Sequence, residues 1–373
     1  MKLSLTPMDT FFFGNHKSFV PGVDHFAEGI FPPRPGTVYG ALRSAYIHAT
    51  SDFNTFVTEE EKELRTWMGS PTEYGKFELS GIFWKDEKDI VLPLPYDHQV
   101  IMNNDDTHMA KRLKLVMEKE AKAWGSDQSP YRLYGVTKQK SGSARGQYVY
   151  KSDLARSLVE ASSLSTYSVS HWLGMEQTMG IAHDQKTRTT KEGMLYAMEM
   201  LRFKNETTSV VAFSDQAPDF SKVNVVTLGA KQRPWSLTTK KQSFSMGINQ
   251  QELINAIEET GVARLILLTS ALWKYGNRPA CWNKQENALV VNEVMYPLLA
   301  TAMGRPSLVG GWDMVRHRPK PRYNAIPSGS VIYLAVPKGE AKNLIQSLHE
   351  VNFSDEMAQL GYGLTVVGCG VIS

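Results

Sequence analysis

Lysines, arginines and aromatic residues gather in three stretches of the chain that contain no acidic residue. Residues 128–152, 220–251 and 314–339 carry five basic residues each, together 15 of the 41 in the chain. Cationic side chains pair with phosphates, and aromatic rings stack on unpaired bases. The pattern favours a polyanion-binding face, although the net charge is only +3; the alternative is three solvated loops that never meet. The basic residues are Arg132, Lys138, Lys140, Arg145, Lys151, Lys222, Lys231, Arg233, Lys240, Lys241, Arg316, Arg318, Lys320, Arg322 and Lys338, and the aromatic residues among them include Tyr131, Tyr134, Tyr148, Tyr150, Trp235 and Tyr323.

A further basic segment lies at residues 176–196, where Lys186, Arg188 and Lys191 alternate with three threonines before an expected strand. Hydroxyl groups and cations together suit contacts with phosphate. A solvated crossover between two domains is the alternative interpretation.

Histidines are the residues that could act as a general base. His16 and His25 lie in the expected loop after the first strand, but neither has a partner that the sequence establishes. The chain contains neither a His-Glu-x-x-His motif nor a Walker-type phosphate loop. Its two cysteines, Cys281 and Cys369, exclude a disulfide framework and a cysteine-rich zinc site. We therefore predict no catalytic residue, no metal site and no cofactor.

A proline-rich lead-in at residues 29–36 precedes an expected helix. Prolines favour extended backbone, and Thr37 is a candidate N-cap for a helix that runs to Ala49. Gly40 and Arg43 share the face opposite the apolar residues of this helix. A glycine within a helix costs roughly 1 kcal/mol relative to alanine, so Gly40 suggests close approach by another chain, either polypeptide or nucleic acid. Ordinary packing of the helix on a sheet is the alternative.

Glycines cluster between residues 361 and 370, after an expected helix and before the last expected strand. This is not a dinucleotide-binding fingerprint, which must open a helix within a βαβ unit. The glycines either let backbone amides face a phosphate or form a tight turn packed in a crowded sheet.

The elements that must position these residues are those of an α+β protein with two domains, 1–190 and 191–373. With 373 residues and 42% apolar residues, the chain is long enough for two cores. No run of 18 apolar residues occurs, and Pro7 and Asp9 interrupt the N-terminus, so we expect no membrane helix, no signal peptide and a cytoplasmic location. The pattern predicts strands at 3–5, 262–268, 330–336 and 364–372, hairpins at 77–94 and 194–213, helices at 105–124, 250–260 and 340–351, and a mobile loop or hairpin tip at 137–147.

Four groups of residues, spread in order over nearly the whole chain, resemble one known family. They are Asp9–Phe13 with Phe31–Arg43; Gly180–Ile181 with Thr187–Tyr196; Gly310–Trp312 with Lys320–Pro321 and Ile326–Val331; and Gly361–Gly363 with Gly368. The pattern is similar to the third-subunit family of the type III-B CRISPR effector, the Cmr complex, within the RAMP superfamily. An arginine expected near Thr178 is absent, which puts one contact in question.

The resemblance implies two ferredoxin-like (RRM-like) domains with inserted helices and a basic β-hairpin or loop, and no nuclease activity. The N-terminal domain would carry the helical insertions and the basic loop, and the C-terminal domain the glycine-rich loop. It also implies a subunit that holds the 5′ tag of the CRISPR RNA, joins the large polymerase-like subunit to a backbone subunit, and meets target RNA only indirectly. The predicted RNA-binding residues are Asn15, Lys17, Arg34, Thr37, Arg43, Lys138, Lys140, Arg145, Lys186, Arg188, Lys231, Arg233, Lys320, Gly361, Tyr362 and Gly363.

Two alternatives stay open at the level of sequence. One is a metal-independent endoribonuclease that cuts CRISPR repeats, because relatives on the same fold use a histidine base. The other is the equivalent subunit of a type III-A complex, which shares the architecture and the role.

Overall fold

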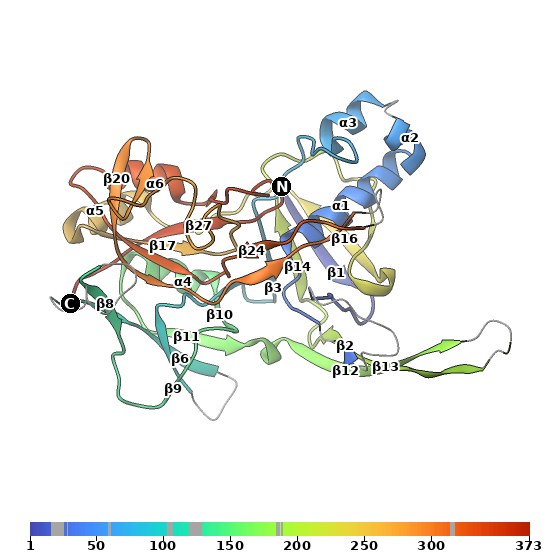
Figure 1. Cartoon of the computed structure of the whole chain (residues 1–373), viewed down its shortest axis with the longest axis horizontal. Helices are drawn as coiled ribbons and strands as arrows, with labels where there is room; N and C mark the ends of the chain where they lie inside the picture. Colours follow the sequence, from blue (N-terminus) through green and yellow to red (C-terminus); the bar gives the residue numbers. More distant parts are fainter. Residues whose placement is uncertain are drawn as a thin grey trace. The chain divides into compact units, whose positions relative to one another are not determined.

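The chain forms two compact units, each assembled from separate stretches of sequence (Figure 1). The computed structural model describes residues 1–15, 26–27, 29–58, 61–102, 107–118, 129–183, 187, 189–313 and 318–373. The first unit comprises Met1–Glu78, Trp172–Gln242 and Gly310–Arg322, and the second comprises Leu79–His171, Ser243–Val309 and Tyr323–Ser373. Two units were expected, but a single boundary near residue 190 was wrong, because each unit takes strands from both halves of the chain.

In its described residues, the first unit has an antiparallel sheet, three α-helices and a long β-ribbon. Its sheet has the order β15-β16-β1-β14, in which β1 pairs antiparallel with both β14 and β16. Its elements are β1 (Lys2–Pro7), β2 (Phe26–Ala27), α1 (Pro35–Thr50), α2 (Phe53–Thr58), α3 (Lys62–Met68), β12 (Leu173–His183), β13 (Thr190–Phe203), β14 (Ser209–Phe213), β15 (Val225–Thr227), a 3₁₀ turn (Ala230–Gln232), β16 (Pro234–Lys240), β22 (Trp312–Asp313) and β23 (Arg318–Pro319).

Helix α1 begins three residues earlier than the predicted N-cap at Thr37 implies. Arg34 is the N-cap and Pro35 the first helical residue, so Thr37 lies within the first turn and is not the cap. Proline suits this position because its fixed φ matches the helix and its missing N–H would have no helical partner. The buried side of α1 includes Val38, Tyr39 and Leu42.

The second unit contains a seven-stranded sheet with the order β18-β19-β20-β25-β17-β27-β26, and further strands in the order β3-β4-β10-β11-β6-β5-β9. Its elements are β3 (Gly81–Lys85), β4 (Ile90–Pro93), β5 (His98–Ile101), β6 (Thr107–Arg112), β7 (Lys114–Met117), β8 (Tyr131–Tyr134), β9 (Ser141–Gly142), β10 (Gln147–Tyr150), α4 (Lys151–Val159), β11 (Leu164–Ser168), a 3₁₀ turn (Val169–His171), α5 (Gln250–Thr260), β17 (Val262–Leu267), β18 (Trp282–Asn283), β19 (Ala288–Val291), β20 (Val294–Ala302), β21 (Ser307–Val309), β24 (Tyr323–Ala325), β25 (Val331–Ala335), α6 (Ala341–Leu348), β26 (Val351–Asn352) and β27 (Leu364–Cys369).

The core of the second unit lies between its helices and the seven-stranded sheet. Leu253 and Ile257 of α5 and Leu344 of α6 belong to one buried cluster with Leu265 of β17 and Val367 of β27. Because strand side chains alternate in direction, the residues of β17 on either side of Leu265 face the opposite way. Arg264 is one of them, and its surroundings are described below.

The segment from α5 to β17 confirms its prediction. The side chain of Asn249 accepts a hydrogen bond from the backbone N–H of Gln251 and caps the helix. Gly261 ends it in the left-handed conformation, with φ at 67°, where glycine bears no steric penalty. Strand β17 then begins at Val262.

Two predicted segments were wrong. The helix expected at 105–124 is, in its described part, strands β6 and β7: His108 and Ala110 are buried while Met109 between them is exposed, a period of two. The hairpin expected at 194–213 does not form, because β13 pairs with β12 and β14 pairs with β1. The hairpin at 77–94 is confirmed by pairing of β3 with β4.

Candidate nucleic-acid interface

The first basic tract presents its cations on a surface loop of the second unit. Lys138, Lys140 and Arg145 are exposed. The loop backbone is anchored by the side chain of Gln99, which donates to the carbonyl of Thr137 at 3.0 Å and accepts from two backbone amides of the loop. Strand β9 within this loop pairs with β5. The backbone is thus held while the cationic side chains reach solvent.

Three of the aromatic residues predicted to stack on bases are core residues instead. Tyr148 is buried with its ring 4.6 Å from that of Trp84, Tyr150 is buried and donates to Asp86 at 2.6 Å, and Trp235 is fully buried. On a strand, a ring beside a lysine in sequence points to the opposite face. Tyr134, by contrast, is 41% exposed.

The second tract meets the Asp9–Phe13 segment in the first unit. The backbone N–H of Ala230 donates to the carbonyl of Phe12 at 2.9 Å, and Arg233 forms an ion pair with Asp9. Lys231, on the turn between these contacts, is exposed and has a left-handed backbone with φ at 58°. The turn therefore projects Lys231 into solvent from a fixed base.

Arg233 has a carboxylate partner, whereas Lys231 takes part in no ion pair among the residues that the structure describes. A backbone hydrogen bond from Thr10, together with Arg233 and Arg202, lowers the pKa of Asp9. Arg202 also bonds to Glu176 at 2.5 Å. The carboxylate of Asp9 thus offsets the charge of Arg233. We therefore expect Arg233 to attract a phosphate less strongly than the exposed Lys231 does.

Arg43 of α1 binds backbone carbonyls within its own unit. Its Nε donates to Met68 at 2.8 Å and its Nη2 to Ser70 at 2.5 Å, and the guanidinium lies 5.2 Å from the ring centre of Phe56. Burial lowers the pKa of Arg43. Arg43 thus fixes the turn after α3. The sequence had suggested only a contact between Arg43 and another chain. Gly40, in contrast, is exposed, and a Cβ there would meet nothing within 4 Å.

The glycine-rich loop is a buried turn of the second unit. Gly361, Tyr362 and Gly363 are all buried, and both glycines have positive φ, 94° and 77°. The N–H of Gly361 donates to Ala358 and that of Gly363 to Ser270. The amides that the sequence interpretation assigned to phosphate already have partners, so the tight-turn alternative is the correct one.

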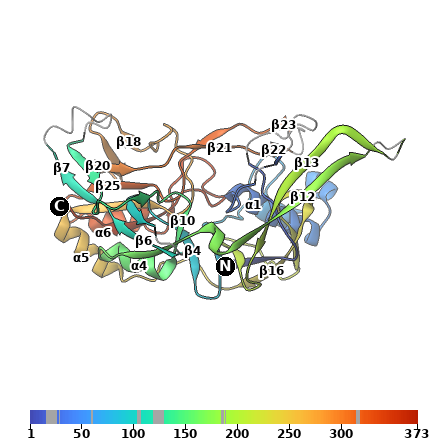
Figure 2. The ribbon, with the colours of Figure 1, turned by 90° about the horizontal axis from the view of Figure 1, so that it is seen from below.

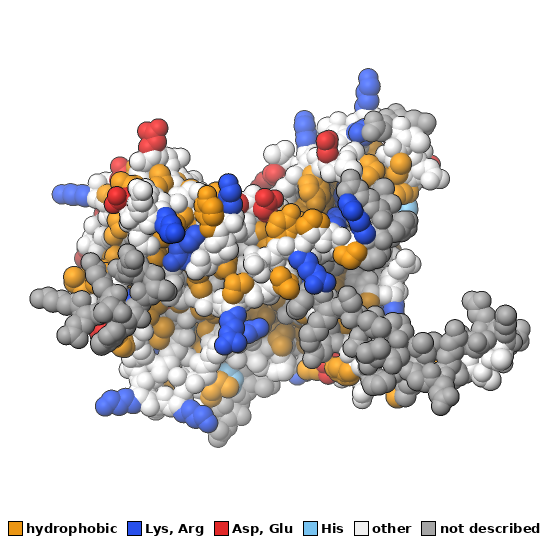
Figure 3. Space-filling model, in the orientation of Figure 1, with side chains coloured by type: hydrophobic (Ala, Val, Ile, Leu, Met, Phe, Trp, Pro, Cys, Tyr) orange, Lys and Arg blue, Asp and Glu red, His pale blue; other side chains and the backbone are white. Residues whose placement is uncertain are grey.

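Of the remaining predicted residues, some are described by the structure and the others are not. Lys320 and Thr37 are exposed, and Asn15 and Arg34 are partly buried. Lys17, Lys186 and Arg188, with His16, His25 and Arg316, lie outside the described residues. On the face drawn in Figure 3, Lys and Arg side chains stand in small separate groups among hydrophobic and uncharged ones.

Strands β12 and β13 form a long ribbon (Figure 2), which β2 extends to a three-stranded sheet. One face of this sheet carries exposed apolar side chains that the sequence interpretation missed. In the strand register Met179 lies opposite Ala197, which lies beside Phe26. Met179 is 64% exposed and Phe26 47%; Met175 and Ile181 lie on the same face of β12, with the polar Gln177 between Met175 and Met179. The opposite face is covered, with Met200 buried against Phe12 and Ala27. The available signal was that Met175, Met179 and Ile181 all fall at odd-numbered positions, and so on one face of a strand.

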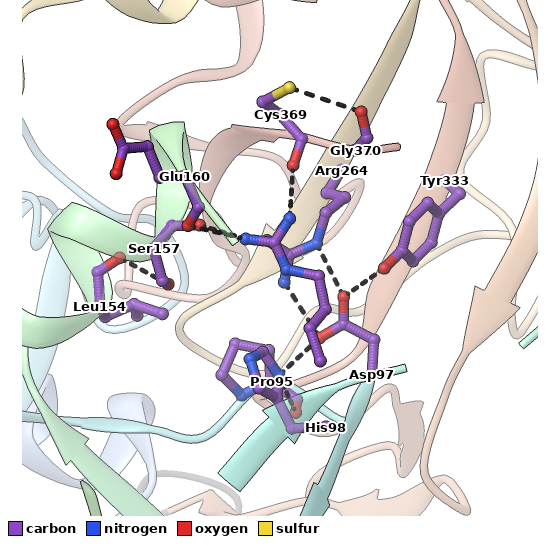
Figure 4. Close-up of polar contacts among 11 residues, drawn as sticks. Pro95, Asp97, His98, Leu154, Ser157, Glu160, Arg264, Tyr333, Cys369 and Gly370 are labelled. Atoms are coloured by element: carbon purple, nitrogen blue, oxygen red, sulfur yellow. Dashed lines mark hydrogen bonds and ion pairs between the residues drawn. The ribbon is translucent and has the colours of Figure 1, made fainter. Parts of the chain in front are cut away.

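A buried cluster in the second unit contains residue types that many active sites use (Figure 4). Asp97 accepts from Arg264 at 2.7 and 3.0 Å, from Tyr333 at 2.7 Å and from His98 at 2.8 Å. Arg112, beside them, donates to the carbonyls of Cys369 and Ser157. The side chains of Asp97, His98 and Arg264 have no exposed surface, so no phosphodiester can reach them. We interpret the cluster as a structural bond between strands β17 and β25 and the start of β5.

The charges in this cluster depend on one another. Burial opposes ionisation of Asp97, but Arg264 and His98 outweigh it and hold its pKa well below the usual range. Burial lowers the pKa of His98, and burial together with Arg264 lowers that of Arg112 to about 10. The aspartate is thus ionised and the histidine neutral.

Neither a metal-binding group nor a membrane-spanning helix occurs among the residues that the structure describes. No cluster of three His, Cys, Asp or Glu side chains could hold a metal ion there. None of the described helices is long and apolar enough to cross a bilayer.

Comparison with known proteins identifies relatives of the whole chain. The model of a family described as CRISPR-associated protein (Cas_Cmr3) matches residues 3–369. A chain in the cryo-EM structure of the Type III-B Cmr-beta bound to cognate target RNA is similar, with a TM-score of 0.51 and 16% identity over 89% of this chain and 86% of that chain. The structure with target RNA and AMPPnP gives a TM-score of 0.50, with the same identity and coverage. No curated protein matches. At this identity the two structures establish a shared fold.

Proposed function

Because the chain belongs to the Cas_Cmr3 family of CRISPR-associated proteins, we propose that it is a non-catalytic RNA-binding subunit of a type III-B Cmr effector complex in the cytoplasm. The family assignment confirms the resemblance drawn from the sequence motifs. The subunit holds the 5′ tag of the CRISPR RNA and bridges the large polymerase-like subunit and a backbone subunit.

The observation that carries the RNA-binding role is a set of exposed lysines on anchored backbone. Lys138, Lys140 and Lys231 are exposed, and none takes part in an ion pair among the described residues. Phosphates displace counterions from such side chains without having to break an internal ion pair. Because the loops that carry them are fixed by hydrogen bonds, less conformational entropy is lost on binding.

The proposed scaffolding role is supported by the exposed face of the β12-β13-β2 sheet. Apolar patches of this kind on one side of a sheet mark surfaces that another protein covers. Met175, Met179 and Phe26 provide flexible and aromatic side chains, which are enriched at interfaces. We assign this face to a neighbouring subunit of the complex.

We also propose that the second unit is built on a ferredoxin-like motif. Four strands of its sheet lie in the order β20-β25-β17-β27, and each pairs antiparallel with its neighbour. In chain order this is the arrangement second, third, first, fourth, with α6 between the third and fourth strands. The first unit has a similar beginning, since α1 follows β1 and β1 occupies an inner position of its sheet. An RRM-like sheet is a common platform for single-stranded RNA.

A reconstitution experiment tests the proposal. The purified chain is mixed with the other Cmr subunits and with CRISPR RNA that carries or lacks the 5′ tag, and assembled complexes are separated by size. We expect the chain to join the complex and to lose most of its RNA affinity when the tag is removed. Labelled repeat RNA incubated with the chain should stay intact. Cleavage would favour the endoribonuclease alternative, and assembly with type III-A subunits alone would favour the other.

A further inference from the structure

Residues 273–284 form a basic and aromatic loop that lies outside all the tracts identified from the sequence. The segment contains Lys274, Arg278 and Lys284, three aromatic residues and no acidic residue. Its last part contains β18 of the second unit (Figure 2). Tyr275 is 57% exposed, Lys274 next to it in sequence is exposed, and Lys284 at the other end of the segment is exposed as well. The loop therefore offers both a ring and cations to solvent.

The loop backbone is held in place by a single carboxylate and by backbone hydrogen bonds. Oδ2 of Asp355 accepts the N–H of Lys274 at 2.7 Å and that of Ala280 at 2.8 Å. The indole of Trp273 donates to the carbonyl of Phe353 at 2.9 Å. The N–H of Tyr275 donates to the carbonyl of Arg278 at 3.1 Å. Both ends of the loop are thus fixed, and Asp355 is engaged by backbone amides.

Cations and rings are paired within the loop. Nζ of Lys274 lies 5.7 Å from the ring centre of Tyr275, and Cζ of Arg278 lies 4.7 Å from that of Trp282. Such pairs keep the cations next to the aromatic surface. A nucleotide presents the matching arrangement, because its base carries a flat π face and its phosphate a negative charge a short distance away.

We propose that loop 273–284 is a second contact for single-stranded RNA, at which the ring of Tyr275 stacks on an unpaired base and Lys274 and Arg278 hold the flanking phosphates. The proposal rests on the proposed RNA-binding function and names a surface of the second unit that it would use. An exposed ring flanked by cations suits a base and its phosphate better than an apolar protein surface, because removing a cation from water against apolar groups is costly.

The test uses the full chain and fluorescence anisotropy with a labelled single-stranded oligoadenylate. Loss of one stacked base corresponds to a roughly 5- to 100-fold weaker affinity, and we expect this loss for Tyr275→Ala. Tyr275→Phe keeps the ring and should bind within about twofold of the unchanged chain. The same Tyr275→Ala change should have little effect on an abasic oligonucleotide, which offers phosphates but no base. Thermal melts of each variant confirm folding.

Charge is tested by a matched pair of lysines in the same unit. Lys274→Ala should weaken binding of both oligonucleotides, whereas Lys342→Ala, an exposed lysine outside the loop and outside the basic tracts, should not. Equal affinity of Tyr275→Ala and the unchanged chain for oligoadenylate would overturn the proposal, as would a Tyr275→Ala defect confined to assembly with other subunits. Failure of the unchanged chain to bind any RNA would instead contradict the proposed function itself.

Discussion

The guanidinium of Arg264 and the carboxylate of Asp97 form a two-point ion pair in which neither side chain has any exposed surface. The two residues are 167 positions apart in the sequence. Their pairing ties the central strand β17 to the start of β5, and Tyr333, directly across from Arg264 in the register, adds a third bond. The pair is an anchor of the second unit, and its removal has a predictable effect.

Replacing one partner of this pair should be strongly destabilising. Asp97→Asn leaves the charge of Arg264 buried without compensation, which costs about 3–5 kcal/mol. Asp153→Asn is the control, because it breaks the pair with Arg156, whose side chain is 77% exposed, and such pairs contribute less than about 1 kcal/mol. Urea denaturation of both variants measures the difference. Similar losses in the two would show that the buried pair is not an anchor.

The stability of the second unit should fall as the pH drops below about 6.5. The pKa of His98 is lowered in the folded chain, so its contribution is complete above the unfolded value of about 6.5 and declines below it. The pKa of Asp97 is also lowered, and its contribution declines further below about pH 4. Melting temperatures measured between pH 8 and pH 5 should therefore fall less for His98→Gln than for the unchanged chain. Parallel curves would contradict this.

Arg43→Ala should lower the free energy of unfolding of the chain. It should also weaken any contact that Arg43 makes with another molecule. It removes two charge-assisted hydrogen bonds to the carbonyls of Met68 and Ser70, each with a net contribution of about 1.5–3 kcal/mol at most. Gly40→Ala, on the open side of the same helix, should instead raise stability by up to about 1 kcal/mol. Thermal melts should therefore show a lower melting temperature for Arg43→Ala and a higher one for Gly40→Ala. An unchanged melting temperature for Arg43→Ala would mean that its contact is external.

A charge on the apolar face of β12 should impair assembly without unfolding the chain. Met179→Lys places an ammonium in the centre of the exposed patch, and we expect roughly tenfold or greater loss of affinity for the neighbouring subunit. Met295→Lys is the control, since Met295 is 47% exposed and belongs to β20 of the second unit. Pull-down of the other subunits measures the effect. Equal recovery with both variants would show that this face is not the interface.

Sequence patterns predicted those elements whose signals are local. The run from Asn249 to Gly261 carries both its cap and its stop, and the resemblance to the family follows from motifs that are contiguous in sequence. The hydrogen-bond partners of Arg43 could not be predicted in this way, because they depend on where the turn at residues 68–70 lies in the folded chain. The pair of Asp97 and Arg264 has no local signal at all. Tyr148 and Trp235 were misassigned because neighbours on a strand face opposite sides.

The central claim is that the exposed lysines of the basic tracts bind the single-stranded tag. The most direct measurement is the affinity of the full chain for labelled tag RNA over a series of salt concentrations. The variant with Lys138, Lys140 and Lys231 changed to Ala should bind more weakly, and its log–log salt slope should be shallower by about 2, because each phosphate that a lysine no longer neutralises reduces the slope by roughly 0.7. A control with Lys62, Lys76 and Lys342 changed to Ala, all exposed and outside the tracts, should keep the original slope. The same slope in both triple variants, or no binding by the unchanged chain, would contradict the claim.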